Sequence, residues 1–303
     1  MYDLIIIGGG PAAVGAGVYA ARKKLKTLLI TESFGGQSLI SDNIENWIGT
    51  KTVTGFELAK NFEEHLRAQE SLEIKMPEKV TAVREIPCAD GKRPCDYEVE
   101  TDQGNRYQAK AVIVTAGARR RRLGVPGEDQ FDGKGVAFCS TCDAPLFDKK
   151  DVVVIGAGNA GLEAVRDCLP YASKIYLLVR GESIKGDAQT LEEIKKSPKV
   201  KIIYLAEALE IIGSAFVSGL KYLDKKDNST KELKLEGVFV EIGAIPNSDF
   251  LGDLVRKNEF NAVFVDKFQR TSLPGIWAAG DVSDFPYRQN NISAGDAIKA
   301  VLD

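Results

Sequence analysis

The chain has 303 residues, of which 44% are hydrophobic and 27% charged, and this length allows two domains with separate cores. Its formal net charge of −3 gives no electrostatic case for binding nucleic acid or a membrane surface. The apolar stretch at residues 4–7 lacks the basic flank of a signal peptide, and five cysteines are too few for a disulfide scaffold. We therefore expect a cytoplasmic protein.

The N-terminus predicts a strand–loop–helix–strand unit that binds a dinucleotide. Asp3–Ile7 is a short apolar strand, Pro11–Lys24 an alanine-rich helix and Leu25–Thr31 a second strand. The loop and helix start carry a G-x-G-x-x-A fingerprint, whose expected cofactor-binding residues are Gly8, Gly10, Pro11, Ala12 and Ala13. Glu32, at the tip of the second strand, would accept hydrogen bonds from ribose hydroxyls and repel a 2′-phosphate. This first site therefore suits FAD.

The next segment predicts a hairpin with two cysteines near its turn. Lys79–Ile86 and Tyr97–Thr101 form the hairpin around Asp90-Gly91, and residues 111–114 form a further strand. Cys88 and Cys95 flank the turn and either pair or remain free; in a reducing compartment we expect free thiols. Arg119–Arg122 is the one dense basic run, which predicts a solvated loop or, alternatively, a docking patch for an acidic partner or a cofactor phosphate.

Cys139-Ser-Thr-Cys142-Asp143 predicts a redox dithiol. Two cysteines at this spacing can close to a disulfide and reopen, and a helix N-terminus would stabilise their thiolate form. Half of a zinc site is the alternative, but no second Cys/His pair stands at metal spacing. The single histidine, His65, lies in a charged predicted helix, Glu57–Gln69, so we expect it to be solvated and we expect no metal.

A second dinucleotide unit follows at once. Asp151–Ile155 and Lys174–Val179 are its strands, and Leu162–Pro170 is its helix. Arg180 occupies the position equivalent to Glu32 and either holds the 2′-phosphate of NADP or is a plain surface arginine. The fingerprint residues expected to contact the nucleotide are Gly156, Gly158, Asn159 and Ala160.

The end of the chain predicts strands that return to the first sheet, at Ala262–Asp266 and from Ile276 to Asp281. The second unit is then inserted into the first. We predict an α/β protein of two dinucleotide-binding, Rossmann-like, three-layer domains. The expected boundaries are 1–116 and 246–303 for the FAD-binding domain, and 117–245 for the NAD(P)H-binding domain that carries the dithiol.

In this order and spacing, these motifs resemble the low-molecular-weight thioredoxin reductases and their relative, the alkyl hydroperoxide reductase flavoprotein. The resemblance covers nearly the whole chain and includes Gly35-Gly36-Gln37, Ile44–Trp47, Thr115–Ala118, Gly243–Asn247 and Tyr287–Gln289. It implies a homodimer that holds FAD in the outer domain and NADPH in the inserted one. The hydroperoxide reductase flavoprotein carries an N-terminal thioredoxin-like domain, so we expect the counterpart of that domain to be a separate protein here.

The resemblance also implies further site residues. For FAD these are Gly36, Gln37, Asn46, Ala116, Gly117, Gly280, Asp281, Arg288 and Gln289. For the nucleotide, the family's His-Arg-Arg signature and following arginine correspond here to Val179-Arg180-Gly181 and Lys185. One cation of the signature is kept and another is replaced by lysine. We expect NADPH, with NADH or reduced ferredoxin as alternative donors.

By the same resemblance, Cys142 would be the thiol next to the flavin and Cys139 the thiol that attacks the partner. Asp143 would be the acid that protonates a leaving thiolate, or else a simple helix cap. The implied activity is that of a thioredoxin-disulfide reductase acting on a thioredoxin-like protein. Service to a peroxiredoxin system and a redox-sensing role without turnover are the alternatives.

Overall fold

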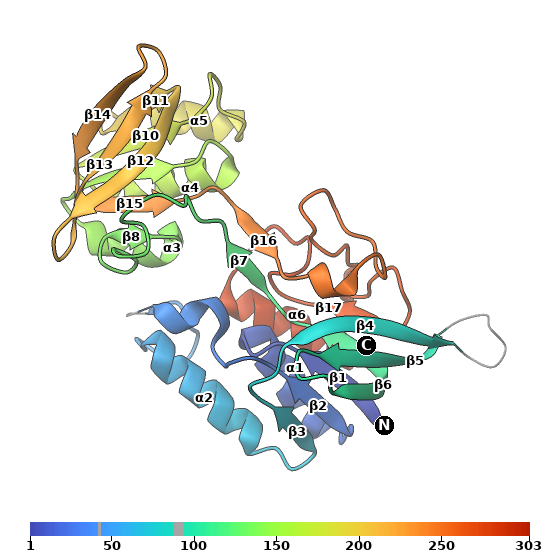
Figure 1. The fold of residues 1–303 in the computed structure, drawn as a ribbon. Helices are drawn as coiled ribbons and strands as arrows, with labels where there is room; N and C mark the ends of the chain where they lie inside the picture. The colour runs from blue at the N-terminus through green and yellow to red at the C-terminus, as the bar shows by residue number, and fades with distance from the viewer. Residues whose placement is uncertain (42–43, 88–93) are drawn as a thin grey trace. The chain divides into compact units, whose positions relative to one another are not determined.

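The computed structural model describes residues 1–41, 44–87 and 94–303, and these residues divide into two compact units. Unit 1 comprises Met1–Arg119 and Ile245–Asp303, and unit 2 comprises Arg120–Ala244. The chain therefore leaves unit 1 once and returns to it once (Figure 1).

Unit 1 is built on a mixed sheet with the strand order β3-β2-β1-β6-β5-β4, and β17 lies beside the second half of β6. Strands β1, β2, β3, β6 and β17 are parallel to their neighbours in this group, whereas β4 and β5 form an antiparallel hairpin. The strands are β1 (Tyr2–Ile7), β2 (Thr27–Ile30), β3 (Leu72–Lys75), β4 (Val80–Pro87), β5 (Pro94–Thr101), β6 (Arg106–Val114) and β17 (Ile276–Ala278).

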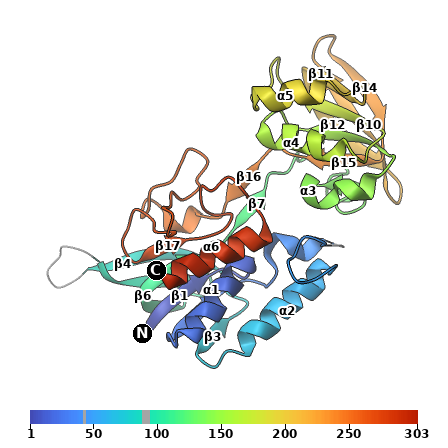
Figure 2. The ribbon, with the colours of Figure 1, turned by 180° about the vertical axis from the view of Figure 1, so that it is seen from behind.

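Successive side chains of β1 point to opposite faces of this sheet and so contribute to two cores, one on each face. Leu4 and Ile6 pack under the helices, while Ile5 and Ile7 face the opposite core. Figure 2 shows α1 and α6 side by side on the helical face. The helices of unit 1 are α1 (Pro11–Arg22), α2 (Gly55–Arg67) and α6 (Asn290–Leu302), with short 3₁₀ turns η1 (Gly36–Ile40) and η3 (Asp249–Leu251).

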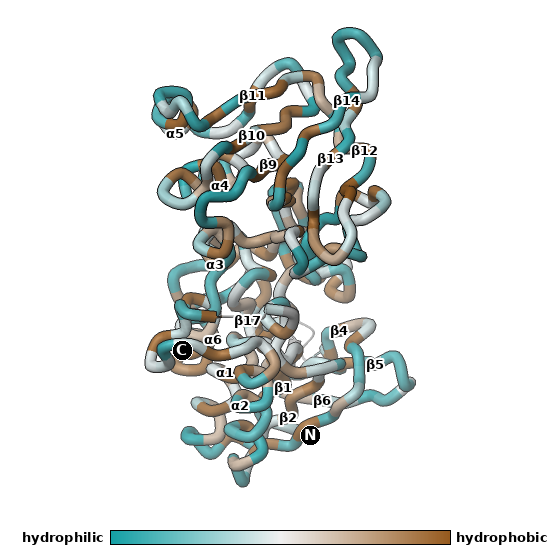
Figure 3. Tube along the Cα trace, turned by 90° about the vertical axis from the view of Figure 1, so that its left-hand side faces the viewer, coloured by the Kyte–Doolittle hydropathy of each residue, from teal (hydrophilic) through white to brown (hydrophobic). Residues whose placement is uncertain are grey.

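Unit 2 has three layers: helices, a parallel sheet and an antiparallel sheet. The parallel strands are mostly apolar because both faces of the sheet are covered, and Figure 3 shows brown segments along β10 and β11; the exceptions are the first residues of β9 and β10, and Lys201 in the edge strand β11. The parallel sheet contains β11 (Val200–Tyr204), β10 (Lys174–Val179), β9 (Asp151–Ile155), β15 (Gly237–Val240) and β8 (Val136–Ala137). The antiparallel sheet contains β12 (Ala206–Gly213), β13 (Val217–Asp224) and β14 (Ser229–Lys234). The helical segments are α3 (Ser140–Asp143), η2 (Ala144–Phe147), α4 (Asn159–Cys168) and α5 (Ala188–Lys195).

The two passages between the units run next to each other as a two-stranded ladder of β7 (Ala118–Arg120) and β16 (Ala244–Pro246). The Arg121 N–H donates to the Gly243 carbonyl at 3.0 Å, which extends this pairing on the unit 2 side. None of the helices formed by the described residues is both long and apolar enough to cross a membrane.

The predicted α/β class and both Rossmann-like units are confirmed. One predicted strand, Ala262–Asp266, is wrong: Val263 makes only isolated bridges, to Lys257 and to Ser283. The reason is local, because the Asn258 side chain accepts the Ala262 N–H at 3.0 Å and so replaces a ladder partner. The interpretation of Cys88 and Cys95 lies outside the described residues, since the position of Cys88 and the side chain of Cys95 are not among them.

Candidate dinucleotide and dithiol sites

The first glycine fingerprint joins the end of β1 to the start of α1. Gly8 has φ +131°, and a side chain there would clash with the Thr115 carbonyl oxygen at the end of β6. Gly10 is the N-cap of α1, and a Cβ on it would fit without a clash, in ordinary contact with the Gly36 Cα at 3.8 Å. Pro11 begins the helix, and Ala12 and Ala13 are buried. The loop thus leaves room for a phosphate to approach the backbone.

Helix capping separates the candidate cofactor-binding helices from the others. Within the described chain, the N-caps of α1, α4 and α6 make no side-chain cap hydrogen bond, and none of these helices has an acidic residue in its first turn. By contrast, α2 has a full capping box from Thr54 and Glu57, and Asp187 caps α5. The backbone N–H groups that start α1, α4 and α6 therefore remain available to an anion.

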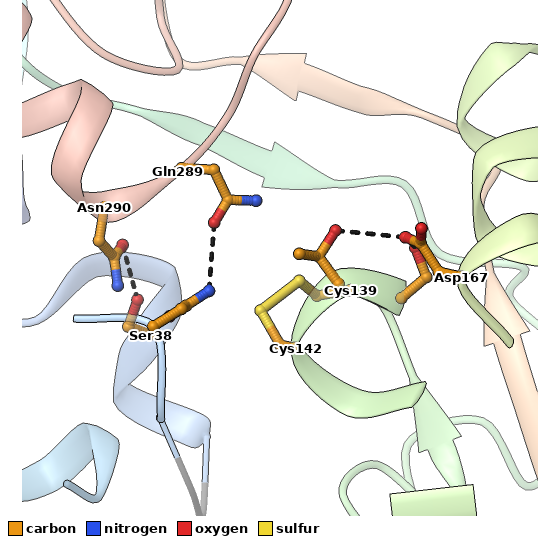
Figure 4. The surroundings of a disulfide bond; sticks show 9 residues. Ser38, Cys139, Cys142, Asp167, Gln289 and Asn290 are labelled. Carbon is orange, nitrogen blue, oxygen red and sulfur yellow. Dashed lines mark hydrogen bonds between the residues drawn. A yellow bond between two sulfur atoms is a disulfide. The ribbon is translucent and has the colours of Figure 1, made fainter. Parts of the chain in front are cut away.

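Residues far apart in the sequence meet beside the start of α6 in unit 1. Gln37 donates to the Asp281 carboxylate at 3.2 Å, and the Ser293 hydroxyl donates to the other oxygen at 3.3 Å. The Asn46 amide donates to Gln289 at 3.3 Å. Figure 4 shows the neighbouring hydrogen bond, from Ser38 to Asn290 at 3.0 Å. Four of the expected FAD residues, Gln37, Asn46, Asp281 and Gln289, are therefore held in two adjacent hydrogen-bonded pairs.

The other expected FAD residues of unit 1 are placed as follows. Glu32 follows β2, is largely exposed and pairs with Lys79 at 3.6 Å. The carbonyl oxygens of Ala116 and Gly117 accept hydrogen bonds from the Asn247 side chain and backbone, both at 2.9 Å. Gly36 faces Gly10 across the first loop, Gly280 packs against Ser293 and Ala12, and Arg288 is exposed in the loop before α6.

The second fingerprint repeats the geometry of the first inside unit 2. Gly156 has φ +143°, and a side chain there would clash with the Glu241 carbonyl oxygen. Gly158 is the N-cap of α4, and a Cβ on it would meet nothing within 4 Å. Asn159 accepts the Asp187 N–H at 2.8 Å, which ties the loop before α5 to the start of α4. The open approach at Gly158 fits the pyrophosphate of a dinucleotide.

The expected nucleotide-binding cations lie at the edge of this second site. Arg180 directly follows β10 and is exposed. Lys185 is also exposed. Its backbone N–H donates to the Ala157 carbonyl at 2.8 Å, so the loop that contains Lys185 lies against the second glycine fingerprint. Ala160 is exposed in the first turn of α4. This placement is compatible with either a 2′-phosphate or a free ribose hydroxyl at Arg180.

The expected dithiol is a disulfide at the start of α3. Cys139 is the N-cap of this four-residue helix and Cys142 lies within it, with their Cα atoms 5.3 Å apart (Figure 4). Strand β8 ends at Ala137, two residues before Cys139, so the end of this strand positions the first cysteine at the start of α3. Thiolates are stabilised at such a position. The pair is therefore placed where one of its sulfurs can act as a nucleophile after reduction.

Asp143 is the third expected catalytic residue, and its environment is compatible with both roles proposed for it. Burial raises the pKa of its carboxyl group to about 6, although the Arg120 charge and a hydrogen bond from the Cys139 N–H oppose the shift. The bond to the Cys139 N–H is a capping interaction. The raised pKa brings a carboxylic acid close to neutral pH, as proton transfer to a thiolate requires.

Three of the four arginines at Arg119–Arg122 are exposed, as expected for a solvated run, although Ala118–Arg120 forms strand β7; the docking role stays a prediction. Arg120 and Arg122 lie over the Phe138 ring, with guanidinium carbons 5.3 and 4.4 Å from its centroid. Arg119 donates to Asn247 at 3.0 Å, and Arg122 also pairs with Asp132 at 2.6 Å. Cation–π and ionic contacts thus anchor the run on its own neighbours. An aromatic residue immediately before the first cysteine was the available sequence signal.

Two more carboxyl groups next to α3 were not expected from the sequence. Asp167 on α4 accepts the Ser140 hydroxyl at 2.8 Å and the Thr141 hydroxyl at 3.3 Å. Glu241 directly follows β15 and receives a hydrogen bond from the Ser140 N–H. Both residues come from the second dinucleotide fold, so no local pattern around the cysteines could have revealed them.

Known proteins resemble this chain along its whole length. The family model of the pyridine nucleotide-disulphide oxidoreductases matches residues 2–297. An alkyl hydroperoxide reductase component of Pseudomonas putida is 39% identical over 302 residues, and an NADH dehydrogenase of Bacillus subtilis is 37% identical over 301. Each alignment covers 99% of this chain but only 57% of the relative. The chain therefore spans a little over half the length of these curated relatives.

Among solved structures, a thioredoxin reductase from Streptococcus pyogenes superposes with a TM-score of 0.89 at 30% identity, covering 100% of this chain and 96% of the other. The family match and this neighbour imply FAD and a pyridine nucleotide as cofactors, and the fingerprint loops of both units fit such groups. The chain also contains a closed Cys139–Cys142 disulfide. The chain therefore belongs to the pyridine nucleotide-disulphide oxidoreductase family, as a flavoprotein of the thioredoxin reductase-like type.

Proposed function

We propose that the protein carries electrons from NAD(P)H through FAD and the Cys139–Cys142 pair to the disulfide of a thioredoxin-like protein. The observation that carries this proposal is the disulfide at the start of α3, with the half-buried Asp143 beside it, in a unit that has its own dinucleotide fingerprint. Unit 1 would hold FAD and unit 2 the nicotinamide nucleotide. We also propose that the protein is a homodimer, as the family resemblance implies.

When bound, the two cofactors supply the electron pair that opens the Cys139–Cys142 disulfide. The Cys139 thiolate, stabilised at the helix N-terminus, then attacks one sulfur of the partner disulfide and forms a mixed disulfide with it. The partner thiolate that leaves takes a proton, which Asp143 would give. Cys142 next attacks the Cys139 sulfur, which restores the disulfide of α3 and releases the second partner sulfur as a thiol after protonation.

The identity of the donor belongs to this proposal. Arg180 and Lys185 supply two cations at the edge of the second site, which supports NADPH, whereas the name of the Bacillus subtilis relative supports NADH. Ferredoxin is the third candidate. An anaerobic titration of the oxidised protein with NADPH, NADH and a one-electron donor, followed by flavin bleaching, separates them. Rapid bleaching by a pyridine nucleotide supports the proposal, and bleaching by the one-electron donor alone contradicts a nicotinamide donor.

The role of the dithiol is tested by cysteine variants. We predict that Cys139→Ser abolishes the reduction of a thioredoxin but leaves flavin reduction by the nucleotide intact, because only the attacking thiol is lost. Cys168→Ser is the matched control, since Cys168 is a free thiol buried in the core of unit 2, and it should keep both reactions. Full thioredoxin turnover by Cys139→Ser would refute the assigned role.

The acceptor has a second candidate. The resemblance to the alkyl hydroperoxide reductase of Pseudomonas putida supports service to a peroxiredoxin system through a separate thioredoxin-like protein. Turnover assays with a thioredoxin, and with a peroxiredoxin plus a thioredoxin-like carrier, decide between the two. Absence of turnover with both, despite rapid flavin reduction, would favour the redox-sensing alternative.

A further inference from the structure

The first turn of α3 is surrounded by carboxyl groups from three separate elements of unit 2. Asp143 lies on α3 itself, Asp167 on α4, and Glu241 at the carboxyl end of β15. Asp167 accepts both side-chain hydroxyl groups of the turn, from Ser140 at 2.8 Å and from Thr141 at 3.3 Å. Glu241 accepts the backbone N–H of Ser140. The residue next to Cys139 is therefore fixed by two carboxyl groups that the proposed mechanism does not use.

Glu241 is held rigidly enough to define this environment. Its backbone N–H donates to the Ile155 carbonyl at 2.9 Å, which continues the parallel pairing of β15 with β9. Its own carbonyl packs against Gly156, where the absence of a side chain permits the contact. The side chain thus starts at the carboxyl end of an inner strand of the parallel sheet, where the backbone is held on two sides.

Charged and titratable groups face Glu241 from each neighbouring element. Burial is the main cause that raises the pKa of Glu241 to about 8; the Arg120 charge on β7 and the Ser140 N–H oppose it, and Asp167 and Asp143 add to it. Cys168 on α4 also feels the Glu241 charge, although burial dominates in raising the pKa of that thiol to about 12. Glu241 is therefore neutral below about pH 8 and negative above it.

Building on the proposed redox role of the disulfide, we propose that Glu241 is a positioning residue for the dithiol. Glu241 holds the first turn of α3, and its charge determines the electrostatic potential at the cysteine sulfurs. A neutral carboxyl group next to the helix N-terminus leaves the helix free to stabilise a thiolate. A carboxylate there repels the thiolate and disfavours its formation. Glu241 thus adjusts the nucleophilicity of the reduced pair through the proton that it gains or loses.

The test uses the intact protein and needs neither donor nor acceptor. The protein is reduced with dithiothreitol, the reductant is removed, and the rate of alkylation of Cys139 and Cys142 by iodoacetamide is measured by peptide mass spectrometry from about pH 5 to about pH 10. We expect the wild-type profile to show a second inflection near pH 8, where Glu241 ionises. In Glu241→Gln that inflection should vanish, and the thiolate midpoint should fall by roughly half a unit to one unit.

The chain offers a matched control for this variant. Glu236 lies at the amino end of the same strand, β15, and accepts a backbone N–H from Asp151 at 3.0 Å. Glu236→Gln removes the same charge and keeps the same kind of hydrogen bond, and its profile should equal that of the wild type. Glu241→Ala also removes the acceptor of the Ser140 N–H, so a shift in this variant alone would overturn the role of the charge.

A profile of folded Glu241→Gln that superposes on the wild type would overturn the proposal, as would an equal shift in Glu236→Gln. Failure of the proposed function looks different. In that case the wild type would not reduce a thioredoxin-like protein, while the alkylation profiles would still differ between wild type and Glu241→Gln. Thiol alkylation and turnover thus report on the two proposals separately.

Discussion

At Asp143, one carboxyl group receives the Cys139 N–H and is also buried next to the disulfide that it would serve. Asparagine at this position keeps an oxygen that accepts the N–H but has no proton to give. We predict that Asp143→Asn slows the reduction of a thioredoxin-like protein by about 100-fold, the low end for loss of a general acid. Flavin reduction by the nucleotide should remain at the wild-type rate. Equal slowing of both half-reactions in a stopped-flow experiment would contradict this role.

The same substitution has an opposite consequence for stability. The pKa of Asp143 rises from 3.8 in the unfolded chain to about 6 in the fold, so the folded state binds the proton more tightly. Ionisation therefore costs folding free energy that is absent below about pH 4, grows up to about pH 6 and is complete above it, at most about 3 kcal/mol.

We predict that Asp143→Asn raises the free energy of unfolding at pH 8 but hardly changes it at pH 4. Urea unfolding at the two pH values measures the difference. Asp129→Asn is the control, because Asp129 is almost fully exposed and only pairs with Arg122 on the surface. A gain of equal size at both pH values would show that packing, and not the proton, is responsible.

The residues around the disulfide differ in how well their proximity to it can be predicted from the sequence. The spacing of Cys139, Cys142 and Asp143 along the chain is enough to predict that they gather, because they share one helical turn. Arg120 and Glu241 reach the same turn only through the insertion of unit 2 and the order of its parallel strands. No local pattern encodes that order, so these two neighbours emerge only from the fold.

At the scale of the elements, the glycine fingerprints predict both strand–loop–helix units. Each fingerprint combines a glycine forced by packing with a glycine at which a Cβ would fit without a clash. The failed strand at Ala262–Asp266 shows the limit of this approach. Ala262 and Val263 are buried but Phe264 is exposed, and an asparagine side chain takes the hydrogen bond that a ladder would need.

The two glycine roles predict opposite outcomes for two neighbouring alanine substitutions. Gly158→Ala places its Cβ in open space, so the stability of the protein should stay unchanged while nucleotide affinity falls by about 10-fold, a loss of about 1.4 kcal/mol. Gly156→Ala forces a side chain against the Glu241 carbonyl at φ +143° and should destabilise unit 2 by at least about 1 kcal/mol. Calorimetric titration and urea unfolding measure the two effects. Equal destabilisation by both variants would contradict the separation.

At the scale of the whole molecule, unit 2 is a continuous segment placed inside a discontinuous unit 1. Each unit has its own sheet, with apolar cores on both faces. Composition and length predict two cores, and the return of β17 to β6 explains why the second unit is an insertion. The exact crossings are set by the pairing of β7 with β16, which joins segments that the sequence separates widely.

Separate cores predict that ligands protect the units separately. A nucleotide at 100 times its dissociation constant should stabilise the unit that binds it by about 2.7 kcal/mol. In hydrogen exchange followed by mass spectrometry, we expect slower exchange in peptides of β9 and β10, while those of β1 and β6 keep their rates. FAD removal should accelerate exchange in β1 and β6. Gly158→Ala is the control, because its 10-fold weaker affinity should reduce the nucleotide stabilisation at the same concentration to about 1.4 kcal/mol. Equal protection of all four strands by the nucleotide would mean that the units unfold as one cooperative body.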